Sequence, residues 1–114
     1  MILKLCWNDI NGMTYELGRL YKKEEYHFDI NSDGLKQATH KGCFGIGEFD
    51  LLHDSYVNTE LFEFFKRRIP KKDNPDIEKI LQEFDIKQYD EMELLKITQG
   101  KLISDRYYLE EVLE

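Results

Sequence analysis

The spacing of apolar residues changes halfway along the chain, and this change limits the folds that the chain can adopt. Residues 26–30 alternate apolar and polar side chains, as a strand that buries one face does, and residues 2–7 indicate another strand. Residues 13–22 continue the pattern around Gly18, which we expect at a bulge or at a close approach of two backbones. Residues 11–12, an Asn–Gly pair, favour a turn. The first third of the chain therefore predicts a meander of short antiparallel strands.

Helical spacing follows in the second half. The aromatic segment 61–65 predicts a helix that Asn58 or Thr59 would cap and that Pro70 would end. Three neighbouring aromatic side chains cannot share one face of a helix, so Phe64 should point away from the face that residues 62 and 65 share. An exposed Phe64 would be a candidate for an interface.

Two further helices are expected downstream. Asn74 followed by Pro75 is a typical helix start, and the apolar residues of 77–84 recur at intervals of three and four. Asp90 would cap the last helix and Gly100 would end it. The residues of that helix expected to face inward are Met92, Leu94, Leu95 and Ile97.

The connecting segments leave alternatives open. Residues 35–41 predict a short helix or an irregular link, and the glycine-rich residues 42–47 predict a short strand or a tight loop. Residues 102–109 are typical of a closing strand or hairpin. Strands first and helices second is the order of an α+β fold, here in a single domain spanning 1–114. We expect a small curled, barrel-like antiparallel sheet, then about three helices and a closing strand.

Composition argues against several classes of function. The net charge of -7 and the pI of about 5.0 argue against direct nucleic-acid binding, which normally uses a basic face. The apolar stretch 1–7 is too short for a signal peptide, and no stretch approaches the ~20 apolar residues of a membrane span. Cys6 and Cys43 lack metal-binding spacing. We expect two buried, reduced thiols in a cytoplasmic protein, with a single disulfide as the alternative.

The sequence gives little support for an ion site. Residues 29–34 begin like an EF-hand calcium loop, but the twelfth position, where that loop needs a glutamate, is His40. A turn after a strand explains these residues better. The three histidines, His27, His40 and His53, follow one another at intervals of 13 residues and match no compact metal site. We therefore expect no bound metal.

Catalysis and phosphate binding also lack a signature. A nucleophilic site would need Cys6 or Cys43 beside a histidine in space, and no local motif indicates such a pair. The segment 45–47 is half of a phosphate-binding glycine pattern, but Asp50 stands where the third glycine would be and would repel phosphate. We expect closely packed strand backbone there, with no cofactor and no enzymatic activity.

Positive charge is concentrated in one segment, which contains Lys66, Arg67, Arg68, Lys71 and Lys72. These cations would complement the end of a helix, face a partner or, as a third alternative, contact nucleic acid. Trp7 is more typical of a core, and a binding hot spot is the alternative. The residues expected to bind a partner are Trp7, Phe64, Arg67 and Arg68.

The order of these landmarks resembles a known family. In chain order they are Gly18–Leu20, the strand 26–29, the aromatic helix ending at 68–70, the amphipathic helix after it, and Leu94–Gly100. Together they are similar to the amino-terminal subdomain of HipA-type serine/threonine kinases. That subdomain also occurs alone, as the HipS-like protein of tripartite HipBST toxin–antitoxin systems. The similarity covers residues 14–110.

Two segments depart from the family pattern. Lys71–Lys72 stands where the family often has an acidic residue and a glycine, and the glycine-rich residues 42–47 replace a serine-rich segment. These departures affect any transfer of detailed contacts.

The resemblance implies regulation by binding. Such a domain holds no ATP, because the kinase machinery lies in a separate chain encoded nearby. It would dock on that kinase and restrain it, as an antitoxin or antitoxin accessory, with a helix-turn-helix DNA-binding protein as a further partner in the same complex. The alternatives are a nucleic-acid-binding accessory that uses the segment 66–72, a HIRAN-associated interaction module, and an enzyme that uses Cys43 or the histidines.

Overall fold

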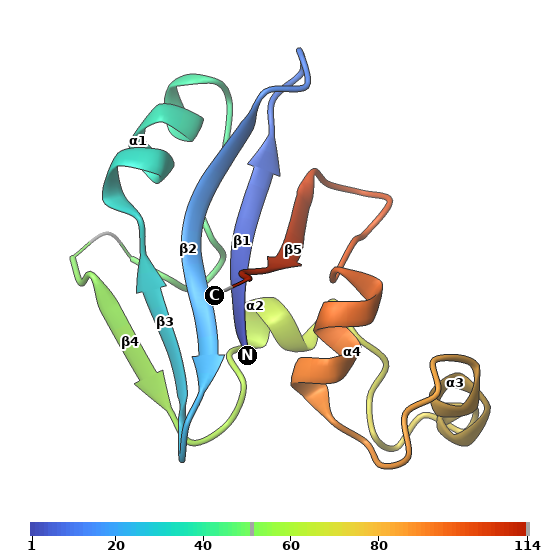
Figure 1. The fold of residues 1–114 in the computed structure, drawn as a ribbon. Coiled ribbons are helices and arrows are strands. Elements are labelled where there is room, and N and C mark those ends of the chain that lie inside the picture. The colour runs from blue at the N-terminus through green and yellow to red at the C-terminus, as the bar shows by residue number, and fades with distance from the viewer. Residues whose placement is uncertain (51, 114) are drawn as a thin grey trace.

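The computed structural model describes residues 1–50 and 52–113, and its centre is a five-stranded antiparallel sheet (Figure 1). The order across the sheet is β4-β3-β2-β1-β5, so the last strand pairs with the first. The predicted α+β class is confirmed, but the sheet does not close into a barrel, because β4 and β5 lie at opposite edges. The strands are β1 (Ile2–Asn8), β2 (Thr14–Lys22), β3 (Tyr26–Ile30), β4 (Ser55–Asn58) and β5 (Tyr107–Glu111).

The described residues include four helices, α1 (Ser32–His40), α2 (Glu63–Lys66), α3 (Ile77–Glu83) and α4 (Glu91–Thr98). α1 packs against β2, α2 and α4 lie beside the sheet, and α3 lies farthest from it (Figure 1). α1 precedes β4, so strands and helices are less segregated than predicted. In the ranges 1–50 and 52–113, no helix has both the length and the apolar character needed to cross a bilayer.

The segment 29–34 joins β3 to α1. Asn31 caps the helix, because its Oδ1 accepts a hydrogen bond of 2.9 Å from the backbone N–H of Gly34. Residues 35–41 were predicted as a short helix or an irregular link, and the structure shows the helix, α1. The Asn31 cap also explains the calcium-loop-like pattern as a strand end followed by a cap.

The predicted starts of α2 and α3 are wrong. Asn58 ends the edge strand β4, which the sequence did not indicate, and α2 begins only after Phe62. Asn74 accepts a hydrogen bond of 2.9 Å from the backbone N–H of Asp76, but this bond closes a turn, and α3 begins after Asp76. Asx turns and helix caps use the same side-chain oxygen, so the sequence alone does not separate them.

α4 follows its prediction closely. Asp90 Oδ1 accepts a 3.2 Å hydrogen bond from the backbone N–H of Glu93, as expected for a cap. The helix ends at Gln99, which adopts the left-handed conformation with φ 59°. Ile97 departs from the prediction because it is 39% exposed. The residues of α4 that are buried as predicted are Met92, Leu94 and Leu95.

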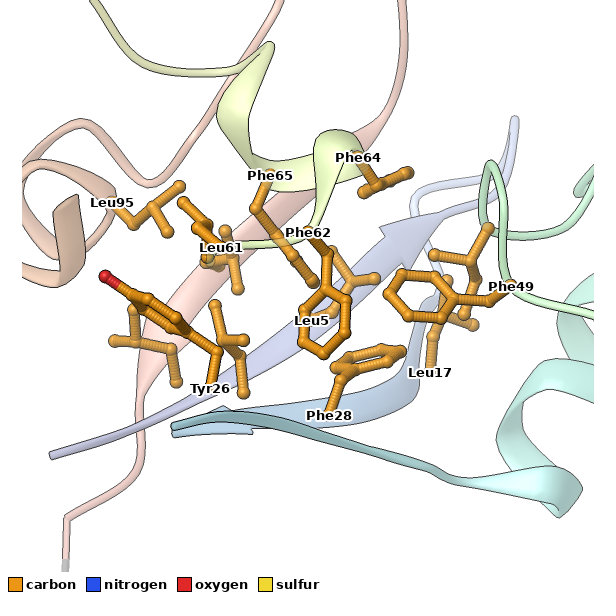
Figure 2. Close-up of a cluster of buried hydrophobic side chains, with 14 of the residues drawn as sticks. Leu5, Leu17, Tyr26, Phe28, Phe49, Leu61, Phe62, Phe64, Phe65 and Leu95 are labelled. Carbon is orange, nitrogen blue, oxygen red and sulfur yellow. The ribbon is translucent and has the colours of Figure 1, made fainter. Parts of the chain in front are cut away.

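One continuous hydrophobic core lies between the sheet and the helices (Figure 2). The ring of Phe28 on β3 lies 5.3 Å from that of Phe65 on α2 and 4.7 Å from that of Phe49. Burying such a side chain stabilises the fold by about 1.5–3 kcal/mol. The side chains with less than 2% exposure are Phe28, Phe65, Leu3, Leu5, Leu17, Leu20, Leu61, Leu94, Leu95, Leu109 and Cys6.

Gly18 lies at a bulge and at a close approach of two strands, as predicted. The β1–β2 register shifts between Leu5 and Cys6, opposite this part of β2. A Cβ atom on Gly18 would lie 2.6 Å from the carbonyl oxygen of Asp29 and 2.6 Å from Cζ of Phe28. Only glycine therefore allows the Phe28 ring to lie across β2.

Candidate functional site

Trp7 is a core residue. β1 has neighbours on both sides, and Trp7 is 6% exposed, with its ring 6.0 Å from that of Tyr15. Its strand is therefore not an edge strand. A side chain enclosed in this way cannot contact a partner unless the sheet rearranges, so Trp7 is removed from the candidate surface.

Phe64 is buried as well, at 3% exposure. Its ring lies 5.2 Å from that of Tyr107 and 5.2 Å from that of Phe65. The backbone of Gly47 lies against its other side, since a Cβ there would be 3.1 Å from Cδ1 of Phe64. Phe64 does point away from the face of residues 62 and 65, but it does not reach solvent, because both the sheet and the loop at Gly47 enclose the single turn of α2.

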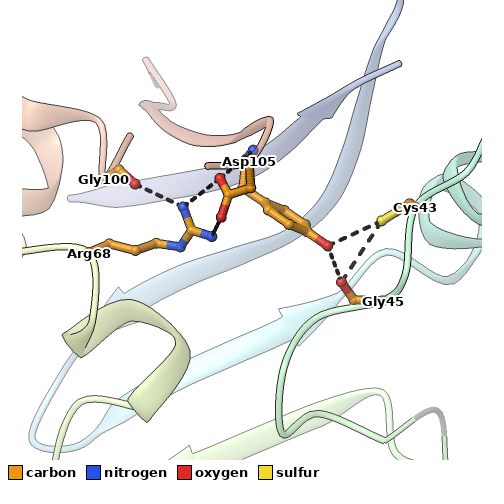
Figure 3. Close-up of polar contacts among 6 residues, drawn as sticks. Cys43, Gly45, Arg68, Gly100 and Asp105 are labelled. Atoms are coloured by element: carbon orange, nitrogen blue, oxygen red, sulfur yellow. Dashed lines mark hydrogen bonds and ion pairs between the residues drawn. The ribbon is translucent and has the colours of Figure 1, made fainter. Parts of the chain in front are cut away.

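Arg68 turns inward and joins α2 to the chain after α4 (Figure 3). Its Nη2 and Nη1 lie 2.6 and 3.2 Å from the two carboxylate oxygens of Asp105, and Nη1 also donates to the carbonyl of Gly100 at 3.0 Å. The guanidinium carbon lies 4.5 Å from the ring centre of Phe64 and 5.1 Å from that of Tyr107. Arg68 is therefore a structural residue, contrary to the prediction that it faces a partner.

The rest of the basic run stays at the surface. Arg67, Lys71 and Lys72 are exposed, and Lys66 lies 3.4 Å from Glu60. All four line an open groove of about 630 Å³ near the turn between β2 and β3. Of the four residues predicted to bind a partner, only Arg67 is accessible.

The opposite end of the sheet carries a second surface. Three loops lie there, and hydrogen bonds connect them to one another or to β5 (Figure 1). They are the β1–β2 hairpin loop 9–13, the loop 41–46 after α1, and the loop 101–106 before β5, and we call them the apical loops. The backbone N–H of Asn8, beside the hairpin, donates to the carbonyl of Arg106 at 3.2 Å. Further hydrogen bonds hold each loop in place.

Asp9 fixes the hairpin loop. Its Oδ1 accepts hydrogen bonds of 2.9 Å from the backbone N–H groups of both Asn11 and Met13, and its Oδ2 accepts one of 3.1 Å from the hydroxyl of Tyr15. Burial alone would raise the pKa of Asp9. The hydrogen bonds from Met13, Asn11 and Tyr15 outweigh it, however, and hold this pKa below its ordinary value.

Tyr107 fixes the loop 41–46. Its hydroxyl donates to the carbonyl of Gly45 and lies 3.5 Å from Sγ of Cys43. Burial, followed by the contact with Cys43, raises the pKa of Tyr107, so the hydroxyl keeps its proton and remains a donor. Of the two alternatives for residues 42–47, a short strand or a tight loop, the structure shows the loop, and the strand expected for 45–47 is wrong. The reason is that Gly42, Gly45 and Gly47 adopt positive φ.

Each apical loop exposes a large apolar side chain, and we call this set of side chains the apical surface. Ile10 is 80% exposed, Phe44 102% and Ile103 109%, each on a different loop, and Met13 beside Ile10 is 61% exposed. Exposed cations stand among them, and none of these is within ion-pair distance of a carboxylate among the described residues. These cations are Lys41, Lys101 and Arg106.

Sequence reasoning missed the apical surface, although a signal was present. Ile10 stands inside a polar turn, and Phe44 stands between glycine-rich residues. An apolar residue at a turn has no core to join, so its presence there can indicate an interface. What the sequence does not show is that three distant turns lie at the same end of the sheet.

The residues considered for catalysis lie apart. His27 stacks on Tyr21, with ring centres 4.9 Å apart, and His53 lies 3.4 Å from Asp50. In the part of the chain that the structure describes, no group of three His, Cys, Asp or Glu residues is placed to hold a metal. Both cysteines are free and buried, and burial raises the pKa of the Cys6 thiol, which makes it a poor nucleophile.

Comparisons of the chain with protein-family models, with curated proteins and with solved structures gave no match. The similarity to the HipA-type amino-terminal subdomain therefore stays a prediction from sequence landmarks.

Proposed function

We propose that this chain is a cytoplasmic, non-catalytic binding module that docks on a HipA-like serine/threonine kinase and restrains it. The apical surface carries this proposal. Exposed apolar side chains that share one end of a protein are typical of protein–protein interfaces, whereas isolated ones are ordinary. The order of sequence landmarks supports the choice of kinase.

The apical surface is suited to binding because its loops are already ordered. Asp9, Tyr107 and the pair Arg68–Asp105 hold them through partly buried contacts, so little conformational entropy is lost when a partner arrives. Full burial of Ile10, Phe44 or Ile103 would contribute about 1.5–3 kcal/mol each. Such anchors are the residues that dominate the free energy of binding in measured interfaces.

Restraint of a kinase requires only that the module occupy the right surface. A kinase must close its lobes and admit substrate to act, and a rigid domain bound across that movement prevents it. An interface of ordinary size uses about 800 Å² of each partner. The described chain exposes 7701 Å², so such an interface would use about a tenth of its surface.

The test is co-expression with the HipA-like kinase encoded beside this chain. We expect a complex that forms at micromolar concentration and a lower rate of kinase autophosphorylation. Phe44→Ser and Ile103→Ser should each weaken the complex about tenfold or more, as truncation of an interface anchor does. The matched controls Val57→Ser and Leu113→Ser, which also remove exposed apolar side chains, should leave the affinity unchanged.

Two results would contradict the proposal. One is the absence of a complex at micromolar concentration with folded wild-type protein. The other is an equal loss of affinity in the apical variants and in the controls, which would mean that the apical surface has no special role.

A further inference from the structure

A groove opens at the end of the sheet opposite the apical surface. β2 runs from Thr14 beside the hairpin loop to Lys22 beside the β2–β3 turn, so its two ends belong to the two surfaces. The groove has a volume of about 630 Å³. We call it the basic groove, and the residues that line it are Lys22, Tyr26, Thr59, Glu60, Glu63, Lys66, Arg67, Lys71, Lys72, Tyr89 and Glu91.

Cations outnumber carboxylates in this groove, five to three, although the chain as a whole has a charge of -7. One cation, Lys66, is compensated, because it lies 3.4 Å from Glu60 and 4.0 Å from Glu63. The other four form no ion pair within the described ranges 1–50 and 52–113, and they are Lys22, Arg67, Lys71 and Lys72. The groove therefore attracts negative charge that the chain itself does not supply.

Two tyrosines contribute aromatic surface and fixed hydroxyls to the groove. The Tyr26 hydroxyl donates to Glu91 at 2.9 Å, and the Tyr89 hydroxyl donates to the carbonyl of Pro70 at 2.7 Å. Nζ of Lys22 lies 4.8 Å from the centre of the Tyr26 ring. These contacts give the lining a defined shape. Together with the uncompensated lysines, they make the groove a site for a ligand with both carbon surface and negative charge.

The mixture of charges favours separate carboxylates over a continuous row of phosphates. Glu60, Glu63 and Glu91 lie among the cations of the lining, so a continuous row of phosphates would have to place some charges beside them, whereas the carboxylates of a peptide can be spaced to face the cations alone. The lining contains a single arginine, Arg67, whereas tight phosphate recognition usually relies on the bidentate fork of arginine. We infer that the basic groove binds an extended acidic peptide segment of another protein.

This inference is independent of the kinase proposal, and a peptide tests it on the isolated chain. The probe is a fluorescently labelled peptide of alternating Glu and Gly, and the comparison peptide has Gln in place of every Glu. Fluorescence anisotropy at low salt should show binding of the Glu peptide alone. The affinity should fall steeply when the ionic strength approaches about 0.15 M, where charges about 8 Å apart are screened.

Two double variants with the same change in net charge locate the site. Lys71→Glu with Lys72→Glu should weaken peptide binding about tenfold, because two exposed attractions become repulsions. Lys79→Glu with Lys87→Glu replaces exposed lysines outside the groove and should change the affinity by less than about twofold. Circular dichroism checks that both variants remain folded.

The inference is overturned if the Glu peptide does not bind at low salt, or if both double variants lose affinity equally. It is also overturned if a single-stranded oligonucleotide of matched length binds more tightly than the Glu peptide. The apical variants Phe44→Ser and Ile103→Ser should bind the peptide as the wild type does. Failure of the kinase complex and failure of the groove are thus separate results.

Discussion

The ion pair between Arg68 and Asp105 gives the strongest test of how this fold is held together. Arg68 is enclosed, with 5% of its side chain exposed, while Asp105 keeps 26% exposure. Asp105→Asn removes the negative charge but can still accept the 3.2 Å hydrogen bond from the backbone N–H of Tyr107. Arg68→Met removes the positive charge and keeps a long apolar side chain against the rings of Phe64 and Tyr107.

The two substitutions should lower the free energy of unfolding by different amounts, because Arg68 is more buried than Asp105. Removing one partner of a buried pair costs about 3–5 kcal/mol, since the other charge is left without compensation. Asp105→Asn leaves the enclosed Arg68 uncompensated, and the partial exposure of this site places the loss near the lower end, about 3 kcal/mol. Arg68→Met leaves Asp105, which reaches water, so the loss should be about 1–2 kcal/mol.

The double variant distinguishes an interacting pair from two independent sites. Because neither charge is left alone, Arg68→Met with Asp105→Asn should cost about 1–2 kcal/mol, well below the sum of the single losses. Urea unfolding followed by the fluorescence of Trp7, the only tryptophan and a buried one, measures each free energy of unfolding. The loss of about 3 kcal/mol should also lower the melting temperature by about 10 °C. Additive losses, or a smaller loss for Asp105→Asn than for Arg68→Met, would refute this reasoning.

Two further predictions concern single residues. Gly18→Ala should lower the free energy of unfolding by about 2 kcal/mol, because the new Cβ would lie 2.6 Å from the carbonyl oxygen of Asp29. A loss below about 0.5 kcal/mol in urea unfolding would contradict this. The folded pKa of Asp9 lies below its unfolded value of about 4, so its carboxylate contributes stability above about pH 4 that is lost as the pH falls through the folded pKa. Asp9→Asn should therefore flatten the acid side of the stability profile, and an unchanged slope between pH 5 and pH 3, as approximate limits, would argue against this role.

Elements set by local patterns were predictable. Alternation of apolar residues located β1, β2 and β3, and the Asp90 cap located α4. These signals depend on neighbours within about four residues, so the sequence contains them in full. Elements set by distant contacts were not predictable. β4 exists because Phe28 and its neighbours on β3 offer a free edge, and α2 is confined to one turn by the surrounding core.

The candidate sites show the same division. The sequence by itself determined the α+β class, the cap of α4, the glycine at the bulge and the concentration of cations at 66–72. Only the tertiary structure decided that Arg68 turns inward while its neighbours line a groove, and that the loops carrying Ile10, Phe44 and Ile103 lie at one end of the sheet (Figure 1). The physical reason is that burial and charge pairing depend on which distant segments meet, and strand pairing brings together residues that are far apart along the chain.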